Sequence, residues 1–285
     1  MGVLLALGSA FNYGLSDYVG GVASRRASFL RIAMLGQIGA LVVVGLAAPV
    51  VSPEIPALAD LAWGGLSGVG TAIGMTFLFR GMGRGAVSIV VPTSAVGGVV
   101  LPVLVGVLVL GERPEPLAWL GIVITLPALW VISRGNGDDA HAARMSVLDG
   151  LVASVGIALQ YLALAQAGPD SGIWAVASGR VTSIVTVLVL GMIVPAQHID
   201  AIAGDGEARR ATAGGLLAGV LAGAALVCYL YATRVELITV AVVVASLYPV
   251  VPVILGVTVL RERLSRGQSA GLVAAMAATV MIASA

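Results

Sequence analysis

Long apolar runs separated by short polar segments dominate the sequence. Each run is close to the ~20 residues that a helix, rising ~1.5 Å per residue, needs to cross ~30 Å of hydrocarbon. The runs show none of the sustained polar and apolar alternation that a membrane β-strand requires. The pattern therefore predicts an all-α membrane protein with ten spans, at residues 3–22, 29–51, 61–79, 87–110, 117–132, 147–167, 172–194, 211–231, 237–260 and 268–283.

Composition supports the bilayer as the solvent of this chain. Of its 285 residues, 59% are hydrophobic and 10% are charged, and the mean hydropathy is +1.06, whereas a soluble domain carries about 25% charged residues. The stretch from Met1 to Ala10 lacks a basic segment, and its apolar run continues past any cleavage point typical of a secretion signal. We therefore assign it to the first helix.

A polar, glycine-rich stretch near the midpoint divides the ten predicted helices five and five. It lies at 134–146 and begins RGNGDDAHAARM, which is typical of a linker between one repeat at 2–133 and a second at 147–284. The halves align at an offset near 150, which pairs Gly64-Gly65 with Gly214-Gly215, Arg84 with Arg234, Pro102 with Pro252, and Glu112-Arg113 with Glu262-Arg263. An internal duplication explains this series.

An odd number of helices in each half predicts that equivalent loops lie on opposite faces of the membrane, as in the inverted repeats of many secondary transporters. All fifteen basic residues are arginine. Eleven lie in the loops after helices one, three, five, seven and nine, two lie in the even loops, and Arg31 and Arg180 lie in or beside spans. The positive-inside rule then places the odd loops in the cytoplasm and both termini outside it.

The fourth and ninth predicted spans carry a related sequence. They read VSIVVPTSAVGGVVLPVLVGVLVLGERPEPLAWLGIVIT and ITVAVVVASLYPVVPVILGVTVLRERLSRGQSAGLVAA. Both resemble the signature of EamA-type domains in the drug/metabolite transporter superfamily, in which a proline-containing helix ends in Leu-Gly-Glu-Arg. The first copy matches fully, whereas the second has Arg261 where glycine is usual.

The resemblance implies two EamA domains and a secondary transporter that exports metabolites, amino acids or drugs, with sugar or metabolite uptake as the alternative. Family members are often drawn with cytoplasmic termini, and the arginine distribution here indicates the reverse. No GxxxxGK[ST] motif is present. We therefore expect a proton or substrate gradient, and not ATP, to drive transport in a cell (inner) membrane.

Asp17 is the carboxylate placed well inside an apolar run, where burying its charge costs at least about 2.5 kcal/mol. It is a candidate coupling residue for a proton or for substrate. The structural alternative is an ion pair with Arg31 across the first helical hairpin, or an interfacial position on a helix that ends early.

Arg180 lies about 13 Å along the seventh helix, deeper than a snorkelling side chain comfortably reaches. A guanidinium at this depth suits an anionic substrate group, which it can bind through two parallel hydrogen bonds. Packing against Asp170, backbone carbonyls or a helix end is the structural alternative.

The best candidates for a substrate pocket are polar and aromatic residues near the middle of equivalent helices, because inverted repeats hold substrate at the midplane. They are Asn12, Tyr13, Gln160, Tyr161 and Tyr248. Trp174, Tyr229, Tyr231 and Ser246 are weaker candidates. Each of these side chains could instead form interhelical hydrogen bonds, core or an interfacial belt.

Four prolines in the fourth and ninth predicted helices remove internal backbone bonds and are candidate hinges. They are Pro92, Pro102, Pro249 and Pro252. Glu112 and Glu262 are expected to anchor helix ends beside Arg113 and Arg263. Glycine patterns such as Gly64-xxx-Gly68 and Gly70-xxx-Gly74 predict close helix contacts.

Other functional classes find little support in the sequence. The single cysteine, Cys228, and the two histidines, His141 and His198, supply no metal set, no redox pair and no HExxH motif, and we expect no cofactor, no metal and no enzyme activity. The sequence also shows no selectivity-filter loop typical of a channel and no basic patch typical of a nucleic-acid-binding protein. The expected partners are a small-molecule substrate and the lipid bilayer, with a monomer as the simplest assembly.

Overall fold

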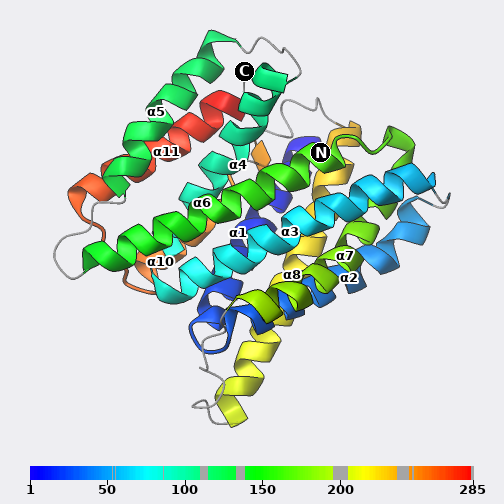
Figure 1. Ribbon diagram of the computed structural model, residues 1–285, viewed down its shortest axis with the longest axis horizontal. Helices are drawn as coiled ribbons and strands as arrows, with labels where there is room; N and C mark the ends of the chain where they lie inside the picture. The colour runs from blue at the N-terminus through cyan, green and yellow to red at the C-terminus, as the bar shows by residue number, and fades with distance from the viewer. Residues whose placement is uncertain are drawn as a thin grey trace.

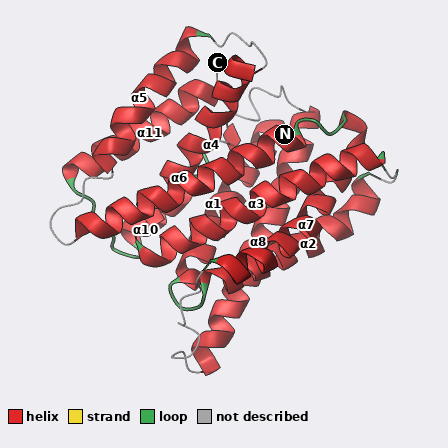
Figure 2. Cartoon of the chain, viewed as in Figure 1, coloured by secondary structure: helices red, strands yellow, loops and turns green. Residues whose placement is uncertain are grey.

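Helices make up the computed structural model in the part of the chain that it describes, residues 1–52, 54, 56–85, 87–109, 115–132, 139–194, 205–235, 244–245 and 247–283 (Figure 1). Among these residues there is no strand, which confirms the all-α prediction for them (Figure 2). The helices are α1 (Gly2–Ser24), α2 (Phe29–Val51), α3 (Leu58–Arg84), α4 (Val87–Val109), α5 (Pro116–Ile132), α6 (Asp139–Leu164), α7 (Trp174–Ile193), α8 (Asp205–Val235), α10 (Val250–Thr258) and α11 (Arg266–Ala283), with a 3-10 turn η1 (Pro169–Ser171) before α7.

Several of these helices suit a bilayer by length and composition. Among the described residues, α2, α3, α7 and the segments His141–Leu164 and Gly206–Tyr229 are long and apolar enough to cross a membrane. Shorter apolar helices cover Val87–Gly98 and Pro116–Ala128. The chain is therefore a multi-pass membrane protein.

Each predicted span overlaps a helix in its described part, and three helices extend furthest beyond their spans. Helices α3, α6 and α8 extend past the apolar runs, and the 31 residues of α8 correspond to about 46 Å, more than the ~30 Å of hydrocarbon. Figure 1 shows the beginning of α8 extending beyond the rest of the bundle. Both α6 and α8 begin at an aspartate, Asp139 and Asp205.

The ninth predicted span is not one continuous helix. In its described part, Leu247–Pro249 form a turn whose backbone tightens to i→i−3 hydrogen bonds, and α10 starts at Val250. Pro249 precedes the first residue of α10, and Pro252 lies in the first turn, where a missing N–H removes no internal bond. The expectation that these two prolines kink a helix interior is therefore wrong, since they mark the start of a helix. Residues 236–243 and Ser246 lie outside the described part.

The helices pack mainly between the two halves of the chain. Helix α3 contacts α6 and α7, and α1 and α2 contact α8, while α2 also contacts α7 and α5 contacts α11. Exchanging α1 with α6, α2 with α7, α3 with α8 and α5 with α11 turns α3–α6 into α1–α8 and α3–α7 into α2–α8, and leaves α2–α7 and α5–α11 unchanged. The packing thus has the pattern expected of two related halves.

Glycines bring these helices close together, as the small-residue patterns predict. A Cβ on Gly64 or Gly68 would overlap the carbonyl oxygens of Ala175 and Gly179 on α7. A Cβ on Gly70 would lie 2.5 Å from the Gly156 carbonyl oxygen on α6. Any larger side chain would force these backbones apart, so the predicted close contacts are confirmed.

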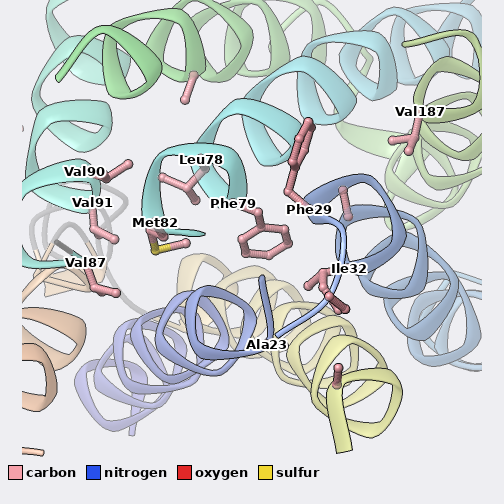
Figure 3. Packing of buried hydrophobic residues seen from close by; sticks show 14 of the residues in the cluster. Ala23, Phe29, Ile32, Leu78, Phe79, Met82, Val87, Val90, Val91 and Val187 are labelled. Carbon is pink, nitrogen blue, oxygen red and sulfur yellow. The ribbon is translucent and has the colours of Figure 1, made fainter. Parts of the chain in front are cut away.

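A hydrophobic cluster joins α1, α2, α3, α4 and α7 near one end of the bundle. Figure 3 shows Phe79 and Met82 of α3 in this cluster, with Ala23 of α1 and Ile32 of α2 nearby. The Phe79 ring occupies the space that a Cβ on Gly20 would need. This packing fixes the end of α3 against α1.

The described loops gather at two opposite ends of the bundle. At one end, Arg25 after α1 donates to the carbonyl oxygens of Met82 (3.3 Å) and Gly85 (3.0 Å), and Arg31 donates to Thr212 Oγ1 of α8 at 2.7 Å. Arg80 and Arg84 of α3 pair with Asp149 of α6 at the same end. We call this end the arginine-rich face.

The opposite end holds the loops after α2 and α6. There, Asp60 Oδ1 accepts a hydrogen bond from Gly168 N at 2.8 Å, and Ser52 Oγ accepts one from Ile173 N at 3.2 Å. Trp174 Nε1 donates to the Ser52 carbonyl oxygen at 2.6 Å. In the described part of the chain, the loops after odd-numbered spans therefore meet at one face and those after even-numbered spans at the other.

Candidate functional site

A buried polar cluster surrounds Arg180 in the interior of the bundle. Arg180 Nη1 donates to Gln37 Oε1 of α2 at 2.9 Å, and Ser183 Oγ donates to the same oxygen at 2.9 Å. Arg180 is 6% exposed and Gln37 2% exposed. Arg180 is buried inside the bundle, as expected, and its hydrogen-bond partner is the neutral Gln37 and not Asp170.

The charge of Arg180 has no protein counter-ion within the described residues. Its hydrogen bond to Gln37 uses one of the five N–H donors of the guanidinium. The ion pairs Arg25–Glu262, Arg80–Asp149 and Arg84–Asp149 lie elsewhere in the chain. Burying a charge is costly unless it is paired or hydrogen-bonded, and the described partner of the Arg180 guanidinium is the neutral Gln37.

Tyrosines from several helices lie around Arg180. Tyr13 of α1 is within electrostatic range of Arg180 and of Tyr161, and Tyr161 of α6 is within range of Arg180 and of Tyr229. The Tyr13 and Tyr248 rings lie 6.2 Å apart between centroids, at an interplanar angle of 55°. The structure therefore places the candidates Tyr13, Tyr161, Arg180 and Tyr248 in one region, together with the weaker candidate Tyr229 of α8.

Asp17 belongs to the same region and is buried, with 5% of its surface exposed. It lies within electrostatic range of Tyr13, Tyr161 and Tyr248. The alternative in which Asp17 pairs with Arg31 is wrong, because Arg31 donates to Thr212 Oγ1 at the arginine-rich face and no ion pair joins the two. Asp17 is thus a buried carboxylate close to a set of hydroxyl groups.

Asn12 and Gln160 have mainly structural surroundings. Asn12 Nδ2 donates to the Gly8 carbonyl oxygen of its own helix at 2.8 Å. The backbone of Gln160 lies against Gly70, at the close contact of α6 with α3. Their neighbour Tyr161 is 51% exposed even though its electrostatic neighbours Asp17 and Arg180 are buried.

The candidate hinges fall in two places. Pro92 and Pro102 lie within the bounds of α4, and Pro249 lies directly before α10. A small, partly open apolar pocket lies between Pro92 and Pro249. Its lining residues are Pro92, Ala95 and Val96 of α4, Leu247 and Pro249 of the turn, and Met276, Thr279 and Val280 of α11.

Glu262 anchors a helix end, although its partners differ from those predicted. Its carboxylate pairs with Arg25 of α1 at 2.7 Å and accepts hydrogen bonds from the N-terminal residues of α4. The ion-pair partner of Glu262 is therefore Arg25 and not the adjacent Arg263. Glu112 and Arg113 lie outside the described residues.

Two important buried residues are not singled out by the sequence pattern. Gln37 is the one amide in the apolar run of α2, and that isolation is a usable signal. Asp149 sits beside the linker and is 1% exposed, and Arg80 Nε donates to its Oδ1 at 2.9 Å. Only the three-dimensional pairing shows that Asp149 joins α6 to α3.

The described residues contain no group of three or more His, Cys, Asp or Glu side chains that could hold a metal ion. The chemistry available in the candidate site is therefore that of a guanidinium, a carboxylate, amide groups and phenol hydroxyls. Such groups bind small polar molecules by charge and hydrogen bonds.

Comparisons with known proteins agree with this architecture. The model of the EamA-like transporter family matches residues 1–134 and 144–284 of the chain. A solved structure described as "Crystal structure of protein" has a TM-score of 0.56 and 17% sequence identity to the chain, and the match covers 99% of this chain and 96% of that chain. At this identity the likeness shows the fold alone. None of the curated proteins matches the chain.

Proposed function

The chain belongs to the EamA-like transporter family, and from that premise we propose that it is a secondary active exporter of a small metabolite, amino acid or drug-like compound. The family is one of membrane transporters, and the apolar helices fit a membrane transporter. A proton or substrate gradient supplies the driving force in this proposal.

The observation that carries the proposal is the buried Arg180 held by a neutral amide. Gln37 orients one edge of the guanidinium without cancelling its charge, which leaves further N–H donors for a ligand. A carboxylate-bearing substrate would complete the pairing through two parallel hydrogen bonds. In this proposal Tyr13, Tyr161 and Tyr248 line the path of the substrate.

Contributions from both halves of the chain support a site at their interface. Tyr13 and Asp17 come from α1, Gln37 comes from α2, and Tyr161 and Arg180 come from α6 and α7. Inverted-repeat transporters hold substrate at the midplane where the halves meet. Exposed surface on Tyr161, beside buried charged groups, fits an opening that reaches this region.

The proposed architecture is ten membrane spans in two inverted five-helix repeats, at 2–133 and 147–284. Support comes from the exchange pattern of the interhelical contacts and from the separation of odd and even loops at opposite faces. We place the arginine-rich face in the cytoplasm and both termini outside it, because cytoplasmic loops carry the excess of arginine. An alkaline phosphatase fused to the C-terminus would be active under this topology, and fluorescence from a cytoplasm-only reporter there would contradict it.

Asp17 is the proposed coupling residue. Because it is buried without an ion pair to a described residue, a change in its protonation or occupancy would change the electrostatics of the tyrosine-lined region. Intramembrane carboxylates with this kind of setting serve as proton relays in many transporters.

A thermal-shift screen of metabolites on the purified protein would identify the substrate class. We expect carboxylate-bearing compounds to raise the unfolding temperature of the wild-type chain and to leave Arg180→Gln unchanged. Gradient-driven, saturable uptake of the same compounds into proteoliposomes would separate a transporter from a channel, which does not couple fluxes. Stabilisation of Arg180→Gln equal to that of wild type would remove Arg180 from the binding site.

A further inference from the structure

The carboxylate of Glu262 makes the densest polar contact at the arginine-rich face. Its Oε1 accepts hydrogen bonds from Arg25 Nη2 at 2.7 Å and from Val87 N at 2.9 Å. Its Oε2 accepts hydrogen bonds from Ser88 N at 3.0 Å and from Ser88 Oγ at 2.5 Å. The Glu262 side chain is 8% exposed, so both oxygens are satisfied by protein donors and shielded from water.

These bonds place a negative charge at the N-terminus of α4. The first N–H groups of a helix have no partner inside the helix, and the helix dipole adds positive potential there. Glu262 fills this role from outside, since it follows α10 in the second half of the chain while α4 belongs to the first half.

The backbone around Glu262 is shaped to deliver the carboxylate. Gly256 of α10 leaves the space that the side chain fills, because a Cβ at that position would lie 2.7 Å from Glu262 Oε2. Glu262 N donates to the Gly256 carbonyl oxygen at 3.0 Å, and the preceding Arg261 has a left-handed φ of 55°. This turn folds the chain back, so that the carboxylate reaches α4 and α1.

One carboxylate therefore holds three segments together: the end of α1, the start of α4 and the turn after α10. Arg25 adds to this joint by donating to the carbonyl oxygens of Met82 and Gly85, at the end of α3. At the opposite face, Gly168 N and Ile173 N donate to Asp60 and Ser52, and Trp174 Nε1 donates to the Ser52 carbonyl oxygen.

We infer that the Arg25–Glu262–Ser88 contact is the lock that closes the arginine-rich face. This inference rests on the proposed transport function, since alternating access requires each face to open in turn. Opening the arginine-rich face must separate α4 from α10 and α1, and all the hydrogen bonds of Glu262 to α4 and Arg25 break in that step.

Cysteine accessibility tests the lock without any knowledge of the substrate. The native cysteine is first removed by Cys228→Ala. The reporter cysteine is then introduced by Val91→Cys, because Val91 is fully buried and lies one helical turn beyond Val87 on α4. The full chain in lipid nanodiscs is labelled with MTSET, a water-soluble cationic thiol reagent. Adding Glu262→Gln should raise the labelling rate about tenfold or more, the effect of losing one charge-assisted hydrogen bond.

Matched variants separate the lock from a general loosening of the fold. Glu207→Gln removes an exposed carboxylate near the same face and should leave the rate unchanged. A second reporter, Ala48→Cys, lies fully buried near the opposite end of α2, and Glu262→Gln should not raise its rate. Arg25→Gln removes the ion pair but keeps the hydrogen bonds of Glu262 to the start of α4. It should also raise the labelling rate of Val91→Cys, and it replaces Glu262→Gln as the test if that variant does not fold.

Two results would overturn the inference. One is a Val91→Cys labelling rate that is the same in Glu262→Gln, Arg25→Gln and Glu207→Gln. The other is an equal acceleration of both reporters, which would mean that the whole bundle has loosened. Neither result depends on uptake measurements, so a failure of the lock is distinguishable from a failure of the proposed transport function.

Discussion

Replacing Gln37 with glutamate should convert the anion site into an occupied ion pair. In the native chain the Gln37 amide oxygen lies 2.9 Å from Arg180 Nη1 and also accepts a hydrogen bond from Ser183. Glutamate has nearly the same shape and would place a carboxylate oxygen at that position. The guanidinium would then have a permanent counter-ion inside the protein.

The magnitude follows from Coulomb's law. A substrate carboxylate bound on the far side of the guanidinium would lie about 6 Å from the carboxylate introduced by Gln37→Glu, and at an effective dielectric constant of about 20 the repulsion is about 3 kcal/mol. Since each 1.4 kcal/mol corresponds to a factor of ten, the affinity for an anionic ligand should fall about a hundredfold. The ligand-free protein should become more resistant to unfolding at the same time, because the buried Arg180 charge is paired.

Thermal unfolding of the purified protein measures both effects. Gln37→Glu should raise the unfolding temperature without ligand and abolish the further rise caused by the anionic compounds found in the screen. Gln37→Met is the matched control, since it keeps the length and removes the acceptor, and it should lower the unfolding temperature. If Gln37→Glu binds the anionic ligand as tightly as wild type, Arg180 is not the anion site.

Three further changes test other parts of the structure. Arg261 is exposed and has a φ of 55°, and a left-handed conformation costs about 1–2 kcal/mol for a residue with a Cβ. Arg261→Gly should therefore stabilise the protein by up to about 1 kcal/mol and lengthen its unfolding half-life. Arg261→Ala keeps the strain and should show no gain in unfolding half-life. Asp17→Asn should abolish proton-driven transport in proteoliposomes while ligand binding stays measurable, and an unchanged coupled rate would remove Asp17 from the mechanism. Gly70→Val should prevent assembly of a monodisperse protein on size-exclusion chromatography, since its Cβ would meet the Gly156 carbonyl oxygen at 2.5 Å; normal elution and stability would contradict the packing described.

The helices themselves were predictable because membrane spans follow from local composition. The bounds of α2 coincide with the apolar run at 29–51, and the isolated arginine in the apolar run of α7 pointed to the burial of Arg180. Repeat symmetry singled out Tyr13 and Tyr161, whose role in a pocket stays a prediction.

Partner identities could not be predicted, because they depend on which helices become neighbours. Arg180 meets Gln37 of α2, and Glu262 meets Arg25 of α1, and in each case a residue nearer in sequence was the expected partner. The interruption before Val250 is likewise not visible in composition, since apolar residues continue on both sides of it. The φ of Arg261 does have a signal, since this residue replaces the glycine of the first copy of the motif.

The packing of α3 against α6 and of α1 against α8 has a consequence for the order in which the chain is made. While the ribosome is still synthesising the second half, the glycine-lined faces of α1, α2 and α3 lack the helices that they contact in the finished protein. The first five helices therefore enter the membrane as a loosely associated group, and their final assembly waits for α6, α7 and α8. A truncated product that ends at the linker would expose these faces to lipid and would become a substrate for quality-control proteases of the membrane.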